Sequence, residues 1–326
     1  MKKKITVLIL CVMLLALCTT ALAQQPGKIF RIGYLDPSTA SGSAVLLDAF
    51  RQELSKAGWI EGKNLTIEYR FGEQKPERVP ELAADLVRLK VDLIMVIGQP
   101  TALAAKNATT TIPIVMANVA DPVSAGLIAS LARPGGNVTG FSGLSNELNT
   151  KRLEKLKDAV PKLALVGLLR PGRGSDFQPK EIRAAALALK LKLEEITTQP
   201  QPKDLERAFQ TAKQKQVGAI MTIASRQFFA ERRRIVELAA KHRLPAVYFQ
   251  KEFVEEGGLM FYGADYVDLY RRAAGYVDKI LKGAKPADLP VQQATKFEFV
   301  INLRAAKQIG LTLSPEFLSR ANRVIK

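Results

Sequence analysis

The stretch VDLIMVIGQPTALAAKNATTTIPIVMA, residues 91–117, decides the fold class. It opens with a continuous apolar run at 91–97, which is typical of a strand covered on both faces. A short helix is expected at 101–109, and residues 112–117 form a second apolar run. A strand, a helix and a strand in this order make a βαβ unit, whose two strands are parallel. The stretch therefore predicts an α/β protein with a parallel sheet.

The same alternation extends in both directions and occurs in two series. In the first series, strands are also expected at 32–35, 65–70 and 138–142, and helices at 44–57, 77–89 and 122–131. In the second, strands are expected at 163–169, 193–197, 219–223, 246–249, 259–262 and 297–302, and helices at 180–190, 202–214, 229–242, 266–281 and 303–309. Two such series predict two lobes, each an open parallel sheet with helices on both faces. Ligands of such sheets lie beyond the carboxyl ends of the strands, so we expect a cleft between the lobes.

The first 23 residues have the features of a secretory signal peptide. Lys2, Lys3 and Lys4 precede an apolar run at 5–17, and Ala21-Leu22-Ala23 provides the small residues of a cleavage site. The apolar run is shorter than the roughly 20 residues that a membrane-spanning helix needs. We therefore expect export, with cleavage after Ala23.

Both cysteines, Cys11 and Cys18, lie within this signal segment. A leucine precedes each of them, where the signal of a lipoprotein has a small residue. We therefore expect a periplasmic protein that is not a lipoprotein. Because the mature chain has no cysteine, it can form no disulfide, no thiolate metal site and no cysteine nucleophile.

The formal net charge is +17, and removal of the three signal-peptide lysines leaves +14. A strongly basic chain raises the question of nucleic-acid binding. Export and the spread of the charges along several helices argue against it. We expect no nucleic-acid partner, and interpret the charge as favouring solubility and the attraction of anionic solutes.

Several short motifs occur in order along the mature chain. They are residues 32–35 (IGYL), 58–65 (GWIEGKNL), 67–70 (IEYR), 109–115 (TTTIPIV), 121–123 (DPV), 133–140 (RPGGNVTG), 252–260 (EFVEEGGLM) and 285–291 (KPADLPV). With these motifs the chain resembles the family of periplasmic substrate-binding proteins of ABC transporters, which includes tryptophan- and tyrosine-type binding proteins. It departs from the family pattern at Ala120, where many members have glycine, and at Ala264-Asp265, where a Pro-Ser type pair is expected.

The resemblance implies a type I periplasmic-binding-protein fold, in which two Rossmann-like lobes with parallel sheets are joined by three crossovers. By analogy, residues 28–144 and 264–288 form one lobe, and residues 145–263 and 289–326 form the other. It also implies the solute-binding component of an ABC importer, which delivers its solute to a permease in the inner membrane. We expect a monomer without a cofactor that captures a small carboxylate-bearing solute, either an amino acid or an aromatic acid.

Candidate ligand-binding residues are polar and aromatic side chains at the expected strand ends. They are Tyr34, Ser38, Gln99, Thr101, Asn118 and Asp121 in the first lobe, and Ser225, Arg226, Phe228, Tyr248, Gln250 and Tyr262 in the second. Free N–H groups at a helix start, with the Thr101 hydroxyl, suit a carboxylate, as does Arg226 or Arg170. Asp121 either accepts from a solute ammonium or caps its own helix. Each aromatic ring either stacks on the solute or packs in the core.

Two other functions compete with import. A sensory binding protein would present its ligand to a membrane receptor, and the sequence alone does not separate it from an importer. An exported α/β hydrolase would need a nucleophile, but the chain has no Gly-x-Ser-x-Gly motif and a single histidine, His242, within a basic helical stretch. We therefore expect no catalytic residue and no metal site.

Overall fold

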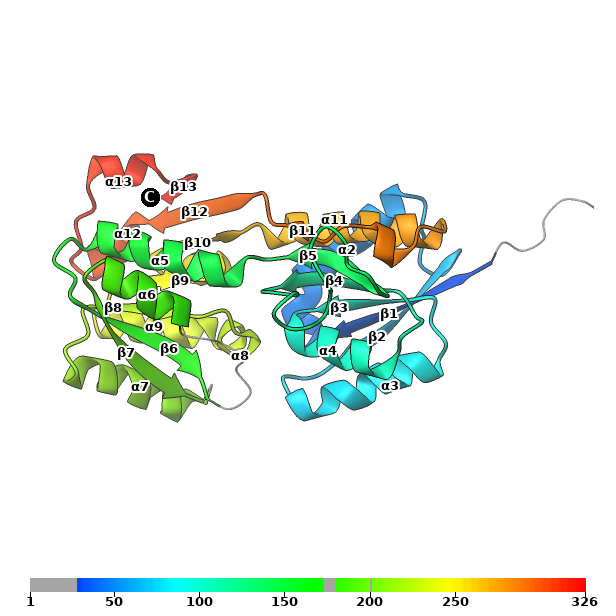
Figure 1. Ribbon diagram of the computed structural model, residues 1–326. Coiled ribbons are helices and arrows are strands. Elements are labelled where there is room, and N and C mark those ends of the chain that lie inside the picture. The colour runs from blue at the N-terminus through cyan, green and yellow to red at the C-terminus, as the bar shows by residue number, and fades with distance from the viewer. Residues whose placement is uncertain (1–27, 173–179, 200) are drawn as a thin grey trace, which may run out of the picture.

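The computed structural model describes residues 28–172, 180–199 and 201–326, which form two lobes, each built around one sheet (Figure 1). The expected signal peptide and its cleavage site lie outside these residues. The first sheet has the strand order β11 (Gln292–Gln293), β5 (Val138–Ser142), β4 (Ile114–Val119), β3 (Leu93–Ile97), β1 (Phe30–Asp36) and β2 (Leu65–Phe71). All of its pairings are parallel, as the sequence predicts.

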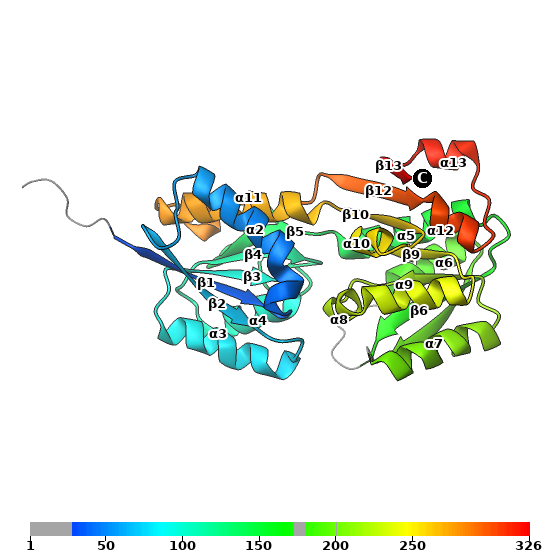
Figure 2. The same ribbon diagram turned by 180° about the vertical axis from the view of Figure 1, so that it is seen from behind.

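The second sheet has the strand order β13 (Arg323–Ile325), β12 (Phe297–Asn302), β10 (Met260–Ala264), β9 (Ala246–Tyr248), β8 (Ala219–Thr222), β6 (Leu165–Pro171) and β7 (Lys192–Thr198). All of its pairings are parallel except that between β10 and β12, so β12 and β13 run opposite to the other strands. This reversal follows from the chain path, because β10 runs toward the first lobe whereas β12 returns from it (Figure 2).

Helices cover both faces of each sheet, and strand β3 shows why. Its five residues are all buried. Leu93, Met95 and Ile97 face a core formed with α2 (Ala40–Lys56) and α11 (Tyr266–Leu281). Ile94 and Val96 face the opposite core, formed with α3 (Val79–Arg88) and α4 (Gln99–Ala108). Because successive side chains of a strand point to opposite faces, a strand between two helical layers must be apolar throughout.

The second sheet is covered in the same way. Helices α5 (Ser145–Ala159), α6 (Lys180–Ala188), α12 (Leu303–Gln308) and α13 (Pro315–Ser319) contribute to the core on one face. Helices α7 (Pro202–Gln214), α8 (Arg226–Ala230), α9 (Arg232–Lys241) and α10 (Glu252–Glu255) contribute to the core on the other. Among the described residues, no helix is both long and apolar enough to cross a membrane.

The chain passes between the lobes three times: from β5 into α5, from β10 into α11, and from β11 into β12 (Figures 1 and 2). The sequence-based division at residue 289 stays a prediction, but β11 lies after it and pairs with β5 of the first sheet.

Two expected elements differ from the structure, and one helix was missed. Residues 122–131 were expected to be helical but form turns, because Gly126 has a φ of +67° and ends the first turn. The single helix expected at 229–242 is divided at Glu231 into α8 and α9. Helix α5 was not expected, although it carries the chain through the first crossing.

Candidate functional site

The carboxyl ends of the central strands in the two sheets point toward each other (Figure 1). In each sheet the strand order reverses direction beside one strand: β1 lies between β2 and β3, and β6 lies between β7 and β8. Ligands of open α/β sheets bind at such reversals. A ligand is therefore expected beside the loops that follow β1, β3, β6 and β8.

The loop after β1 is organised by Asp36, a fully buried carboxylate. It accepts hydrogen bonds from the Tyr34 hydroxyl at 3.3 Å, the Ser38 backbone N–H at 2.8 Å and the Ser43 hydroxyl at 2.6 Å. Tyr34 is itself buried and packs against the rings of Phe50, Tyr69 and Phe71. Of the two predicted residues here, Tyr34 therefore belongs to the core, and Ser38 is 3% exposed.

Helix α4 begins directly after β3, with Gly98 as its N-cap at a φ of +78°. No side chain of the described residues caps it, so backbone N–H groups at Gln99 and Thr101 are without a side-chain cap. The Thr101 hydroxyl points the other way: it donates to the carbonyl oxygens of Ile97 at 2.7 Å and Gly98 at 3.0 Å, and the residue is fully buried. A carboxylate at this position would accept hydrogen bonds from the backbone N–H groups of α4, because the Thr101 hydroxyl already donates to carbonyl oxygens.

Asn118 and Asp121 follow β4. The Asn118 Oδ1 is buried and has no hydrogen-bond partner within the described chain, and its backbone adopts a φ of +57°. The Asp121 Oδ1 accepts from the Ser124 N–H at 3.0 Å. Hydrogen bonds from the Ser124 hydroxyl and N–H hold the pKa of the Asp121 carboxyl below its usual value. The structure thus shows the capping alternative for Asp121, although the cap opens a turn rather than a helix.

In the second lobe, Ser225 caps α8 by accepting from the Phe228 N–H at 3.3 Å. Phe228 is fully buried in the core, and the side chain of Arg226 lies outside the described part of the structure. Thr222, at the end of β8, has a buried hydroxyl without a hydrogen-bond partner among the described residues.

The other aromatic candidates differ in their surroundings. Tyr248 is 1% exposed and stacks on Phe253 with ring centroids 4.8 Å apart, and burial raises the pKa of its hydroxyl. Tyr262 is half-buried on β10, where the Lys155 ammonium lies 5.8 Å from its ring centroid. Tyr248 therefore packs in the core, whereas Tyr262 lies beside the crossing from β10 to α11.

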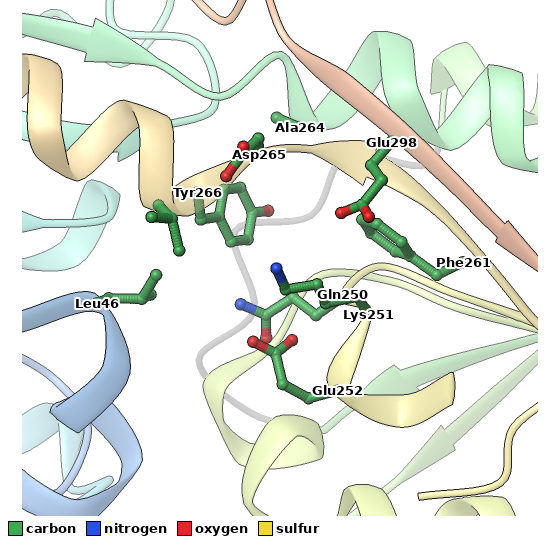
Figure 3. A pocket seen from close by; sticks show the side chains of 10 residues that line it. Leu46, Gln250, Lys251, Glu252, Phe261, Ala264, Asp265, Tyr266 and Glu298 are labelled. Carbon is green, nitrogen blue, oxygen red and sulfur yellow. The ribbon is translucent and has the colours of Figure 1, made fainter. Parts of the chain in front are cut away.

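A pocket lies at this crossing and is lined from both lobes (Figure 3). We call it the hinge pocket; its lining residues are Leu46, Gln250, Lys251, Glu252, Phe261, Ala264, Asp265, Tyr266, Val267 and Glu298. Leu46 of α2 and Tyr266 and Val267 of α11 belong to the first lobe. Asp265 lies in the second crossing, and the other lining residues belong to the second lobe. Its cavity volume is about 20 Å³, and the surrounding empty space of about 270 Å³ includes open solvent. The cavity therefore suits a small polar group of a solute rather than a whole solute.

Among the predicted residues whose side chains the structure describes, only Gln250 lines the hinge pocket. Its side chain and those of Lys251 and Glu252 gather on one side of the pocket, with Leu46 opposite (Figure 3). Burial is the main cause that raises the pKa of the Glu252 carboxyl above its usual value. The sequence reasoning missed Lys251 and Glu252, although they directly follow Gln250 beyond the end of β9.

A second missed residue is Arg152 on α5, which is fully buried. Its Nε donates to the Tyr262 carbonyl oxygen at 2.7 Å and its Nη1 to the Asn149 Oδ1 at 2.8 Å. Burial lowers the pKa of the Arg152 guanidinium to about 10. Arg152 therefore ties the helix of the first crossing to the strand of the second.

The arrangement provides a small inter-lobe space with one ammonium, several carboxylates, an amide and apolar side chains. Within the described ranges, no group of His, Cys, Asp or Glu side chains is placed to hold a metal ion. These groups can form hydrogen bonds and ion pairs with a polar solute.

Comparison with known proteins identifies relatives in sequence and in fold. The chain is 28% identical over 275 residues to a tyrosine-binding protein of Clostridioides difficile, covering 80% of this chain and 75% of the relative. A conserved domain protein of Vibrio cholerae superposes with a TM-score of 0.84 at 29% identity, covering 91% of this chain and 100% of the other. An ABC domain of Streptococcus pneumoniae in complex with L-Trp superposes with a TM-score of 0.79 at 26% identity, covering 90% and 100%.

The match to a family model is longer than any single motif. Residues 41–325 match the model described as ABC transporter substrate binding protein, and this range includes every described strand except β1 as well as all three crossings. The two-lobed α/β fold expected from the sequence is confirmed. The chain belongs to the ABC transporter substrate binding protein family.

Proposed function

We propose that this substrate-binding protein captures a small carboxylate-bearing solute, an amino acid or an aromatic acid, between its lobes and delivers it to the inner-membrane permease of an importer. The observation that carries the proposal is the hinge pocket, because Leu46 of the first lobe faces residues 250–252 of the second across it. A solute bound there contacts both lobes, so it favours the conformation in which they are close.

Lys251 supports a carboxylate as the recognised group. It lines the pocket and forms no ion pair with the residues that the structure describes, so its ammonium is available to an anion. The uncapped start of α4 offers further N–H donors from the first lobe. The relatives add to this support, since one is named for tyrosine and another holds L-Trp.

The role of the family indicates where in the cell the protein works. Substrate-binding proteins of ABC transporters work outside the cytoplasm and pass small solutes to a permease. We infer that this chain is exported with cleavage after Ala23, that it is a periplasmic monomer, and that it carries no lipid anchor.

Thermal melting of residues 24–326 with added solutes tests the proposal. L-tyrosine, L-tryptophan and their aromatic acid analogues are compared with neutral sugars. A solute at a hundredfold excess over its dissociation constant adds about 2.7 kcal/mol to the free energy of unfolding, so a true ligand raises the melting temperature measurably. A shift with neutral sugars alone would contradict the proposal.

A pair of lysine variants provides the control. Lys251→Gln removes the pocket ammonium and is expected to weaken binding of the solute about tenfold. Lys241→Gln removes an exposed lysine that pairs with Glu206 at 2.6 Å on the surface, and it is expected to leave the affinity unchanged.

A further inference from the structure

The hinge pocket contains more hydrogen-bond acceptors than its single lysine can serve. Glu252, Asp265 and Glu298 contribute carboxylates, and Gln250 contributes an amide. One Asp265 oxygen already caps α11 by accepting from the Asp268 N–H at 3.1 Å. The two acceptor groups that a ligand could satisfy are the Gln250 Oε1 and the Glu252 carboxylate.

Gln250 is only 6% exposed, and its Oε1 receives no hydrogen bond from the described residues. A buried oxygen without a donor costs about 1–3 kcal/mol of stability, so such atoms are rare in folded proteins. Figure 3 shows the Gln250 side chain at the pocket, beside those of Lys251 and Glu252. A ligand N–H group that donates to the Gln250 Oε1 would remove this cost in stability.

Glu252 is half-buried and forms no ion pair within the described part of the chain. Burial raises the pKa of its carboxyl, and the nearby Lys251 and Arg232 oppose this only partly. Arg232 is itself paired with Glu256 at 3.3 Å. The pocket therefore holds a partly desolvated carboxylate whose charge the protein compensates only in part.

A metal ion does not fit this demand, because the described residues offer no cluster of ligands for one. A purely anionic solute would add like charge to Glu252 and would leave Gln250 Oε1 without a donor. A primary ammonium meets both needs, since it has three N–H donors and a positive charge.

We propose that the hinge pocket binds the ammonium group of the solute between the Gln250 Oε1 and the Glu252 carboxylate. The solute is then an amino acid rather than an aromatic acid without an amino group. This inference rests on the proposed function, which leaves the two classes open. Lys251 lies between the two residues in the sequence and is placed to take the carboxylate of the same head group.

Calorimetric titration of residues 24–326 with two matched solute pairs tests the inference. The pairs are L-tyrosine with 3-(4-hydroxyphenyl)propionate and L-tryptophan with indole-3-propionate, which differ only in the amino group. The wild-type protein is expected to bind at least one of the amino acids about tenfold or more tightly than its analogue, because a charge-assisted hydrogen bond is lost. Equal affinity for both members of each pair would overturn the ammonium site and leave the proposed function standing.

Two glutamate variants localise the effect. Glu252→Gln is expected to weaken amino acid binding about tenfold and to leave the analogue unaffected. The control, Glu255→Gln, removes a carboxylate from the same helix that is exposed and lies 3.6 Å from Arg323, and it should bind like the wild type. Equal loss in both variants would contradict the assignment, since it would reflect the helix charge and not the pocket.

A third variant guards against loss of folding. Gln250→Met removes the unpartnered oxygen without leaving a cavity, so the unliganded protein should melt no lower than the wild type while amino acid affinity falls. Unchanged affinity in this variant would contradict the role of Gln250. If no carboxylate-bearing solute binds any form of the protein, both the inference and the proposed function fall.

Discussion

At the carboxyl edge of the first sheet, Asp36 accepts hydrogen bonds from Tyr34, Ser38 and Ser43, whereas in the hinge pocket Gln250 Oε1 accepts none from the described residues. Both groups are buried. The comparison shows that buried polar residues at strand ends can have two different roles. Those that satisfy one another shape the loop, whereas an unpartnered one such as Gln250 Oε1 is the atom that we propose the ligand to contact.

Removing Asp36 is expected to have the largest effect on stability. Asp36→Ala leaves the Tyr34 and Ser43 hydroxyls and the Ser38 N–H buried without their acceptor, so the free energy of unfolding should fall by about 3 kcal/mol. Urea unfolding followed by circular dichroism measures the change. Asp48→Ala, at an exposed position of α2, is the matched control and should change stability by less than about 0.5 kcal/mol.

If Asp36→Ala cost no more than Asp48→Ala, the loop after β1 would not depend on its internal hydrogen bonds. The claim that the satisfied hydrogen bonds of Asp36 stabilise this loop would then be wrong.

Thr101→Ala is expected to have a smaller effect and separates two interpretations of that residue. The hydroxyl donates to the Ile97 and Gly98 carbonyl oxygens, so its loss should lower the free energy of unfolding by about 1 kcal/mol. The affinity for the solute should change less than about twofold, because the side chain is fully buried. Calorimetry and thermal melting on the same sample provide both values. A large loss of affinity at unchanged stability would restore Thr101 as a ligand residue.

The smallest expected effect is a pH dependence at Glu252. Because burial raises the pKa of this carboxyl in the folded protein, its protonated form is favoured there. Its contribution to stability is fully present at acid pH, below the ordinary value for glutamate, and is lost as the pH rises through the raised pKa. Without solute, Glu252→Gln should therefore be more stable than the wild type at neutral pH, and the difference should disappear at acid pH.

Other charged groups near Glu252 also affect its pKa, so they must be the same in the two proteins that are compared. Glu255 on the same helix raises its pKa, Lys251 and Arg232 lower it, and Asp265 and Glu298 share the pocket. Since all five are present in both proteins, the difference between wild type and Glu252→Gln isolates the one carboxyl. Parallel stability curves at every pH would show that Glu252 is not desolvated.

The two sheets were predictable because each central strand is apolar on both faces. Residues 93–97 and 114–119 contain the strands where the apolar runs place them. Helix α5 escaped prediction because its buried stripe includes Asn149 and Arg152, polar residues at positions where a helix normally repeats an apolar one. Their burial depends on the Tyr262 carbonyl, which is distant in sequence.

The candidate site was predictable only in outline. The principle that ligands lie at strand ends led to Gln250, which does line the hinge pocket. It could not distinguish Gln250 from Tyr34 or Thr101, because that depends on which partners each side chain finds in the folded chain. The pocket itself joins Leu46, residues 250–252, the second crossing and Glu298, and this proximity is a property of the chain path.

A crystal structure of residues 24–326 with a bound amino acid would test the central claim most directly. The account predicts the solute ammonium within about 3 Å of both the Gln250 Oε1 and a Glu252 carboxylate oxygen. A solute bound between the lobes with its ammonium on other residues, and with Gln250 Oε1 still without a donor, would contradict it.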